Sequence, residues 1–139
     1  MKNIFIDTNI LLDLLTDRKP FSDHTEELLD LSQTQKIKVY VSAISFNNIY
    51  YIIRKANGHK SSIKLIREMR ELVNIIPVGE DIIDKALASE FHDFEDGIQY
   101  FSALSNKNIE AIITRNSKDF KSSDLPILSS HEACRMIKK

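Results

Sequence analysis

Three aspartates stand where alternating strands and helices would bring carboxylates together. Asp7 closes one apolar segment, Asp119 follows another after a short turn, and Asp96 opens an expected helix. Asp93 precedes Asp96 by three residues and so lies on the same side of that helix. Carboxylates about 4 Å apart repel by about 4 kcal/mol at an effective dielectric constant of about 20. If these groups converge, they therefore need a cation, a basic partner or protonation.

An all-oxygen ligand set favours Mg²⁺ or Mn²⁺, and no His and Cys pair has the spacing of zinc ligands. A hard divalent ion on an acidic edge suits phosphodiester hydrolysis, since it activates water and stabilises charge on the phosphate. The sequence has no convincing Ser-His-Asp or Cys-His arrangement and no glycine-rich nucleotide-binding loop. These residues therefore point to metal-assisted hydrolysis rather than nucleophilic or cofactor chemistry.

Each acid also has a purely structural interpretation. Asp93, Glu95 and Asp96 would complement the dipole of a helix whose first turn they occupy. Asp119 is compatible with an Asx turn. Asp7 is the hardest to explain in this way, because Asp is depleted from strands.

Hydrophobic periodicity and turn signals predict the elements that would position these acids. The alternation of strands and helices predicts an α/β fold with a central parallel sheet of four to five strands and helices on both faces. Ligands bind at the carboxyl ends of such strands. Gly58 is expected to end a helix, and Gly97 weakens the case for another. The expected strands are residues 3–7, 38–41, 74–78, 110–114 and 125–128, and the expected helices are 9–15, 21–35, 45–56, 61–73, 80–89, 94–105 and 131–138.

Length and composition suit one compact domain, so we expect residues 1–139 to form a single unit. Cys134 is alone, so no intramolecular disulfide can form. Asp7, Asn9 and Asp13 interrupt the apolar N-terminal stretch, which argues against a signal peptide or a membrane span. The cytoplasm is therefore the expected location.

The net charge of −1 hides an uneven distribution along the chain. Basic residues dominate positions 54–70, and acids dominate positions 80–96. Such a chain can hold a polyanion on one segment and cations on the other. Two solvated helix faces would explain the same pattern.

Four motifs follow one another along nearly the whole chain. They are Asp7-Thr8-Asn9, Ser42-Ala43-Ile44-Ser45-Phe46-Asn47-Asn48, Asp96 at a helix start, and Thr114-Arg115-Asn116-Ser117-Lys118-Asp119-Phe120. In this order they resemble proteins of the PIN-domain family, and in particular the small toxin ribonucleases of the VapC type. The first and last motifs together are fairly specific to that family, whereas either motif alone would be weak evidence.

The resemblance implies a three-layer α/β/α fold and cleavage of RNA that depends on Mg²⁺ or Mn²⁺. It also implies a homodimer and an antitoxin protein that covers the acidic pocket. Carried onto this sequence, it makes Asp7, Asp96 and Asp119 catalytic, metal-binding acids. The supporting residues would be Thr114 and Asn116 beside that cluster, Asn9 holding Asp7, and Asp93 at the rim.

The sequence departs from the family at Asn48, where many members carry Glu. The amide oxygen of Asn48 can accept a hydrogen bond or bind an ion weakly, but it supplies no negative charge. A place in a polar first helical turn would explain Asn48 equally well. Asn48 is therefore a candidate catalytic residue, and we expect the site to bind metal more weakly than a site with four acids. The alternative function is a non-catalytic RNA- or protein-binding module.

The basic residues at positions 54–70 would bind the RNA. Lys60, Lys64, Arg67 and Arg54 are expected to neutralise phosphates, which gives salt-sensitive contacts with little sequence preference. Tyr50, Tyr51 and Tyr100 either stack on bases or pack within the protein. A phosphoacceptor domain, either a haloacid-dehalogenase-like phosphatase or a receiver domain, is a third possibility. The phosphatase would need an Asp two residues after Asp7, where this sequence has Asn9. The receiver domain would need an acidic pair after the first strand and a Lys after a late strand, and the sequence has neither.

Overall fold

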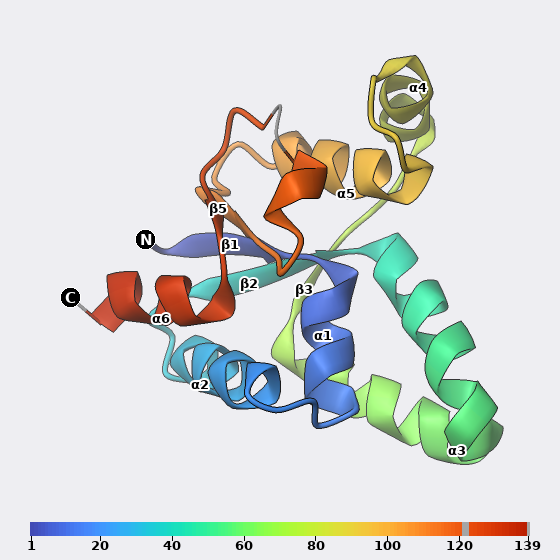
Figure 1. The fold of residues 1–139 in the computed structure, drawn as a ribbon, viewed down its shortest axis with the longest axis vertical. Helices are drawn as coiled ribbons and strands as arrows, with labels where there is room; N and C mark the ends of the chain where they lie inside the picture. The colour runs from blue at the N-terminus through green and yellow to red at the C-terminus, as the bar shows by residue number, and fades with distance from the viewer. Residues whose placement is uncertain (121–122, 139) are drawn as a thin grey trace.

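The computed structural model describes residues 1–120 and 123–138, which form a five-stranded parallel sheet covered by helices on both faces (Figure 1). The strand order is β3-β2-β1-β4-β5. The register pairs Ile4 of β1 with Val39 of β2, and Phe5 of β1 with Ile112 of β4. The strands are β1 (Asn3–Ile6), β2 (Lys38–Ser42), β3 (Asn74–Ile76), β4 (Ala111–Ile113) and β5 (Ile127–Leu128).

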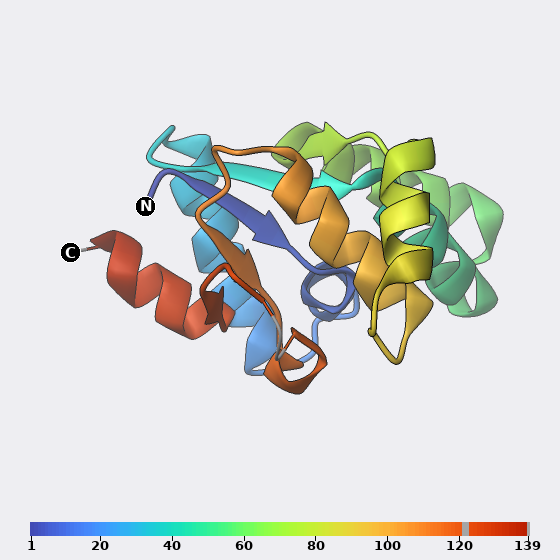
Figure 2. The ribbon, with the colours of Figure 1, turned by 90° about the horizontal axis from the view of Figure 1, so that it is seen from above.

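The helices divide between the two faces of the sheet. Figure 1 shows α4 and α5 above the sheet and α1, α2, α3 and α6 below it. Figure 2, the view from above, places α4 and α5 nearest the viewer, with α2 behind the sheet. The helices are α1 (Thr8–Leu15), α2 (Phe21–Gln33), α3 (Ala43–Leu72), α4 (Glu80–Ala88), α5 (Phe94–Ser105) and α6 (Ser130–Lys138), with a short 3-10 helix, η1 (Ser117–Phe120).

Alternation along β1 separates two hydrophobic layers. Ile4 and Ile6 are fully buried with apolar side chains of α1, α2, α3 and α6. Phe5 points to the opposite face and packs with Tyr100 of α5 and Ile112 of β4. A strand covered on both faces has to be apolar throughout, which explains the continuous Ile-Phe-Ile run. The predicted α/β/α fold is therefore correct.

Helix α3 confirms the break that the sequence analysis expected at Gly58. Two helical stretches meet there at a kink, and the second continues to Leu72. Gly58 has φ 74° and ψ 176°, a conformation that is almost restricted to glycine. The kink divides α3 into a proximal arm, residues 43–57, and a distal arm, residues 59–72, which meet at a corner in Figure 1.

Gly97 does not weaken α5, because it lies where α5 packs closely against α4. A Cβ at this position would lie 3.3 Å from the Cβ of Ala86 and 3.4 Å from Oγ of Ser89. Close packing of the two helices therefore favours glycine here. Among the described residues, none of the helices is long and apolar enough to span a bilayer.

Candidate active site

The candidate site lies at the carboxyl ends of β1 and β4, where the strand order changes direction. Chain crossovers place β2 and β3 on one side of β1, and β4 and β5 on the other. A crevice forms at such a point in parallel α/β sheets. Asp7 follows β1 directly, and its backbone N–H donates to the carbonyl of Ile113 in β4 at 2.9 Å.

A pocket of about 270 Å³ opens at this edge, and we call it the acidic pocket. It brings together the three predicted acids, the candidate Asn48 and three of the four predicted supporting residues. The fourth, Thr114, contacts Asp7 directly. The lining residues are Asp7, Thr8, Asn9, Leu12, Asn48, Ile52, Asp93, Glu95, Asp96, Asn116 and Asp119.

Asp7 is 5% exposed and is held by two hydrogen bonds. The Thr114 hydroxyl donates to Oδ2 at 2.9 Å, and the Thr8 backbone N–H donates to Oδ1 at 2.8 Å. Asp7 is thus the N-cap of α1, where the helix dipole favours a negative charge. The described residues show no hydrogen bond from Asn9 to Asp7, so the predicted role of Asn9 is corrected: Thr8 and Thr114 hold Asp7.

Hydrogen bonds link Asp7 to the segment that carries Asp119. The backbone N–H of Asn116 donates to Oγ1 of Thr114 at 3.1 Å, and the N–H of Asp119 donates to the Asn116 carbonyl at 2.9 Å. Asp119 lies exposed in η1. The Thr-Arg-Asn-x-x-Asp-Phe motif therefore positions one acid through its threonine and presents a second at the mouth of the pocket.

The first turn of α5 supplies the remaining acids. Asp93 is the N-cap, and Oδ1 accepts the backbone N–H groups of Glu95 at 2.8 Å and Asp96 at 3.3 Å. Asp96 is half-buried, whereas Asp93 is exposed at the rim. The structural interpretation of Asp93 is therefore correct, and the same residue also lines the acidic pocket.

Burial raises the pKa of Asp7 to about 6, because it removes water from the carboxylate. The hydrogen bonds from Thr114 and Thr8 act in the opposite direction. The negative charges of Glu95 and Asp119 raise the pKa further. The ionised form of Asp7 is therefore destabilised by burial and by neighbouring negative charges, and a nearby cation would stabilise it.

Partial burial also raises the pKa of Asp96, to about 7. Neighbouring negative charges contribute to the same shift, and none of the causes lowers it. Those charges belong, in decreasing order of effect, to Asp119, Asp93, Asp7 and Glu95. A pocket that penalises its own ionised carboxylates in this way is chemically suited to a divalent cation.

The donor set fits a hydrated hard cation. Carboxylate and amide oxygens dominate the pocket, which matches the preference of Mg²⁺ and Mn²⁺. In the described residues, no three His, Cys, Asp or Glu side chains already converge as one ligand cluster. Mg²⁺ commonly binds through one or two carboxylates and keeps several waters, so a cation here would contact some of these acids through water.

Two amides in the acidic pocket have buried polar atoms without partners in the described residues. They are Nδ2 of Asn48 and Oδ1 of Asn9. Asn48 is half-buried and faces the pocket from α3, whereas its neighbour Asn47 is exposed. A buried donor without an acceptor costs free energy, so Asn48 is available to donate to a bound group.

A buried polar network, which the sequence analysis did not identify, fixes the three elements that surround the pocket. Nε2 of Gln99 in α5 donates to Oγ1 of Thr8 at 2.9 Å and to Oγ of Ser45 at 3.2 Å. Thr8 and Ser45 also share a hydrogen bond of 2.8 Å. Because Gln99 lies one turn after Asp96, this network fixes the start of α5 relative to Asp7 and Asn48.

Glu95 is a site residue that the sequence analysis assigned only to the helix dipole. It is half-buried, lines the acidic pocket, and its charge acts on both Asp7 and Asp96. Its position one residue before Asp96 was the available signal. Adjacent helical residues normally point in different directions, so the spacing argued against including both.

Arg115 lies within the last motif but turns away from the acids. Its Nε forms a 2.5 Å ion pair with buried Asp13, and its guanidinium lies 4.8 Å from the ring centroid of Phe21. Arg115 therefore links the loop after β4 to α1 and α2 rather than contributing to the acidic pocket.

The predicted RNA-binding residues occupy a different surface. Lys60, Lys64 and Arg67 line one groove on the distal arm of α3, together with Glu68 and Glu71. Arg54 does not join them, because its guanidinium lies 5.2 Å from the ring centroid of Tyr51 and 5.9 Å from that of Tyr50. None of these basic residues lines the acidic pocket.

The three tyrosines differ in role. Tyr100 is buried in the core, and its hydroxyl accepts the backbone N–H of Asp124 at 3.1 Å, which excludes base stacking in this arrangement. Tyr50 forms a hydrogen bond with His59 at 2.7 Å. Tyr51 is 55% exposed and remains available for stacking.

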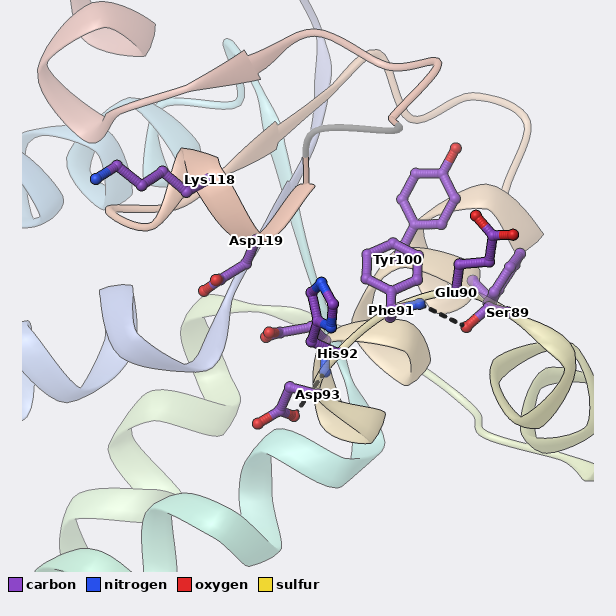
Figure 3. A pocket seen from close by; sticks show the side chains of 10 residues that line it. Ser89, Glu90, Phe91, His92, Asp93, Tyr100, Lys118 and Asp119 are labelled. Atoms are coloured by element: carbon purple, nitrogen blue, oxygen red, sulfur yellow. Dashed lines mark hydrogen bonds between the residues drawn. The ribbon is translucent and has the colours of Figure 1, made fainter.

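A second pocket, of about 500 Å³, adjoins the acidic pocket and shares Asp93, Asp96 and Asp119 with it. Figure 3 shows Asp119 reaching from η1 and Asp93 lying at the start of α5, with Lys118 directed away from both. Phe91 and His92 line this second pocket. This second pocket therefore places aromatic surface beside the acids.

Comparisons with known proteins match both the sequence and the fold. A family model described as PIN domain matches residues 3–118. Ribonuclease VapC1 of Aquifex aeolicus is 26% identical over 138 residues, which cover 96% of this chain and 94% of that protein.

Solved structures share the architecture at low sequence identity. VapBC2 from Rickettsia felis, bound to a promoter DNA fragment, has a TM-score of 0.70 at 15% identity and covers 91% of this chain and 98% of its own. A toxin-antitoxin complex from Klebsiella pneumoniae has a TM-score of 0.65 at 24% identity, with coverage of 93% and 98%. These similarities establish a common fold.

Proposed function

The chain belongs to the PIN-domain family, and we propose that it is a metal-dependent endoribonuclease, the toxin of a toxin-antitoxin pair. The observation that carries this proposal is the acidic pocket. Asp7, Asp96 and Asp119 line it from three separate segments, and the pKa values of Asp7 and Asp96 are raised. Such an arrangement is unfavourable without a cation.

In this mechanism Asp7, Asp96 and Asp119 would hold Mg²⁺ or Mn²⁺. The ion would lower the pKa of the attacking water and offset the charge on the phosphodiester. Thr114 keeps Asp7 oriented, and the network around Gln99 keeps Asp96 near it. The unpartnered Nδ2 of Asn48 would donate to a phosphate oxygen.

RNA would reach the acidic pocket by contacts elsewhere on the protein. Lys60, Lys64 and Arg67 would neutralise phosphates from the distal arm of α3, and the second pocket would accommodate nucleotides beside the acids. Arg54 would act through its stack with Tyr51, which together offer a charge and an aromatic face to RNA.

An antitoxin would act by covering the acidic pocket. Exposed Ile52, which is 52% accessible, lines the pocket, and Tyr51 lies next to it in sequence. These apolar side chains suit a protein partner. A structural neighbour from Klebsiella pneumoniae was solved as a toxin-antitoxin complex, which supports this proposal. We also propose a homodimer, for which the resemblance to the family is the only support.

The test is cleavage of a fluorophore-quencher single-stranded RNA by the purified protein with Mn²⁺ or Mg²⁺. We expect cleavage that is abolished by EDTA and by Asp7→Asn. Asp84→Asn, a change of an exposed acid on α4 outside the acidic pocket, is the matched control and should leave activity intact. Cleavage that survives Asp7→Asn would reveal a contaminating nuclease.

Asn48 favours one alternative, a non-catalytic RNA- or protein-binding module of the same fold. This alternative predicts RNA binding without cleavage under any metal condition. Expression in cells separates the two functions independently. The toxin should arrest growth and be rescued by a small neighbouring gene, whereas a binding module should leave growth unaffected.

A further inference from the structure

We propose that Glu95 supplies the fourth carboxylate of the cation site, from α5, in place of the acid that is missing at Asn48 on α3. This inference rests on the proposed function, because it concerns the same acidic pocket. It assigns to Glu95 a role in metal binding rather than in helix stability alone.

The position of Glu95 supports this role. The residue is half-buried and lines the acidic pocket together with Asp7, Asn48 and Asp96. Asp93 accepts its backbone N–H, which fixes the first turn of α5 with its end directed at the pocket. Both Glu95 and Asp96 reach the pocket for this reason, although they are adjacent in sequence.

The electrostatic surroundings of Glu95 point in the same direction. It lines the same pocket as Asp7, which follows β1, and Asp96 of α5, so its negative charge faces acids from two different segments. In the described residues Glu95 has no ion-pair partner. An unpaired carboxylate beside Asp7 and Asp96 costs stability unless a cation completes the group.

Asn48 explains why a carboxylate is needed from another element. It occupies the α3 wall of the acidic pocket, but an amide carries no charge. Its buried Nδ2 also lacks an acceptor in the described residues, so its role is that of a donor. Glu95, which lines the same pocket from α5, can supply the negative charge that α3 does not provide.

The competing explanation is that Glu95 only complements the dipole of α5. Glu80 provides the matched comparison, because it is an acid in the first turn of α4 and lies outside the acidic pocket. A dipole role predicts similar effects for Glu95→Gln and Glu80→Gln. A metal role predicts that only Glu95→Gln changes cation binding.

The experiment measures Mn²⁺ binding by calorimetry at pH 8 on the full chain, with the wild type, Glu95→Gln, Glu80→Gln and the double variant Asn48→Glu/Glu95→Gln. We expect Glu95→Gln to weaken Mn²⁺ binding at least about tenfold and Glu80→Gln to leave it unchanged. The double variant should recover most of the affinity, since it returns a carboxylate to the same pocket. Metal-free melting should show Glu95→Gln folded and no less stable, because repulsion is removed.

Each outcome has a distinct meaning. Equal Mn²⁺ affinity of the wild type and Glu95→Gln would overturn the inference and leave the proposed function standing. If the double variant binds Mn²⁺ as weakly as Glu95→Gln does, the idea that a carboxylate at position 95 replaces one at position 48 would be overturned. A wild type that binds no Mn²⁺ at millimolar concentration would overturn the metal-dependent function itself, and this inference with it.

Discussion

Asp7 depends on Thr114 to remain ionisable in a buried position. The 2.9 Å hydrogen bond from the Thr114 hydroxyl opposes the rise in pKa that burial causes. The same hydroxyl accepts the N–H of Asn116, so it also fixes the segment that leads to Asp119. Thr114 is therefore a positioning residue for two acids.

Replacing Thr114 by Val should therefore raise the pKa of Asp7 above about 6 and lower the free energy of unfolding by about 1 to 3 kcal/mol. The reason is that Asp7 and the N–H of Asn116 both lose a partner. Urea unfolding measures the stability, and carboxyl NMR titration measures the pKa. Thr114→Ser keeps the hydroxyl and should resemble the wild type; a Ser variant as unstable as Val would point to packing instead.

The stability of the metal-free protein should fall as the pH rises from 5 to 8. The folded state raises the pKa of Asp7 to about 6 and that of Asp96 to about 7, so it binds protons more tightly than the unfolded chain. This stabilisation is complete below the unfolded pKa values and is lost as the pH rises through the folded ones. For Asp7 the shift corresponds to about 3 kcal/mol.

Urea unfolding in EDTA at pH 5 and pH 8 measures this dependence. Asp7→Asn should reduce it to the part that Asp96 contributes, whereas Asp84→Asn should leave it unchanged. Adding Mn²⁺ at pH 8 should restore stability in the wild type, because the cation replaces the lost protons. If the free energy of unfolding of the wild type is constant or rises with pH, the folded state does not raise the pKa values of these acids.

Helix α3 connects the acidic pocket to the groove lined by Lys60, Lys64 and Arg67 through its kink. The proximal arm carries Asn48 to the acidic pocket, and the distal arm carries Lys60, Lys64 and Arg67. The kink depends on Gly58, whose backbone angles are nearly exclusive to glycine. The direction of the basic groove relative to the acids is therefore set by one residue.

Gly58→Ala should lower the free energy of unfolding by about 1 to 3 kcal/mol, although no atom lies within 4 Å of the added Cβ. The cost is entirely one of backbone conformation. Thermal or urea unfolding measures it, with Asn57→Ala as the adjacent control that should change stability by less than about 0.5 kcal/mol. A neutral Gly58→Ala would mean that the two arms adopt another angle without penalty.

At the scale of the whole molecule, positive and negative charge are separated between two surfaces. The net charge is only −1, yet the acids gather at the carboxyl edge of the sheet and a basic groove lies on the distal arm of α3. A phosphate backbone would be repelled at the first surface without a cation and attracted at the second. Cation binding and RNA binding should therefore depend on different residues.

Neutralising the groove with Lys60→Gln, Lys64→Gln and Arg67→Gln should weaken single-stranded RNA binding. It should also reduce the slope of log affinity against log salt by about 2, since each lost contact contributes about 0.7. Fluorescence anisotropy in an Asp7→Asn background, which should not cleave, measures this. A control with Gln at Lys36, Lys85 and Lys107, all exposed elsewhere, should keep the wild-type slope; equal losses in both variants would indicate a nonspecific charge effect.

The sequence alone predicted the order and type of the elements, because hydrophobic period, glycines and strand-end acids are local signals. It also predicted that Asp7, Asp96 and Asp119 would meet, since the carboxyl ends of parallel strands share one edge. Contacts between distant residues were decided only by the tertiary structure. These include the Gln99 network and the place of Glu95 in the acidic pocket. Each of these depends on how two elements far apart in the chain pack together, and no spacing within one segment encodes that geometry.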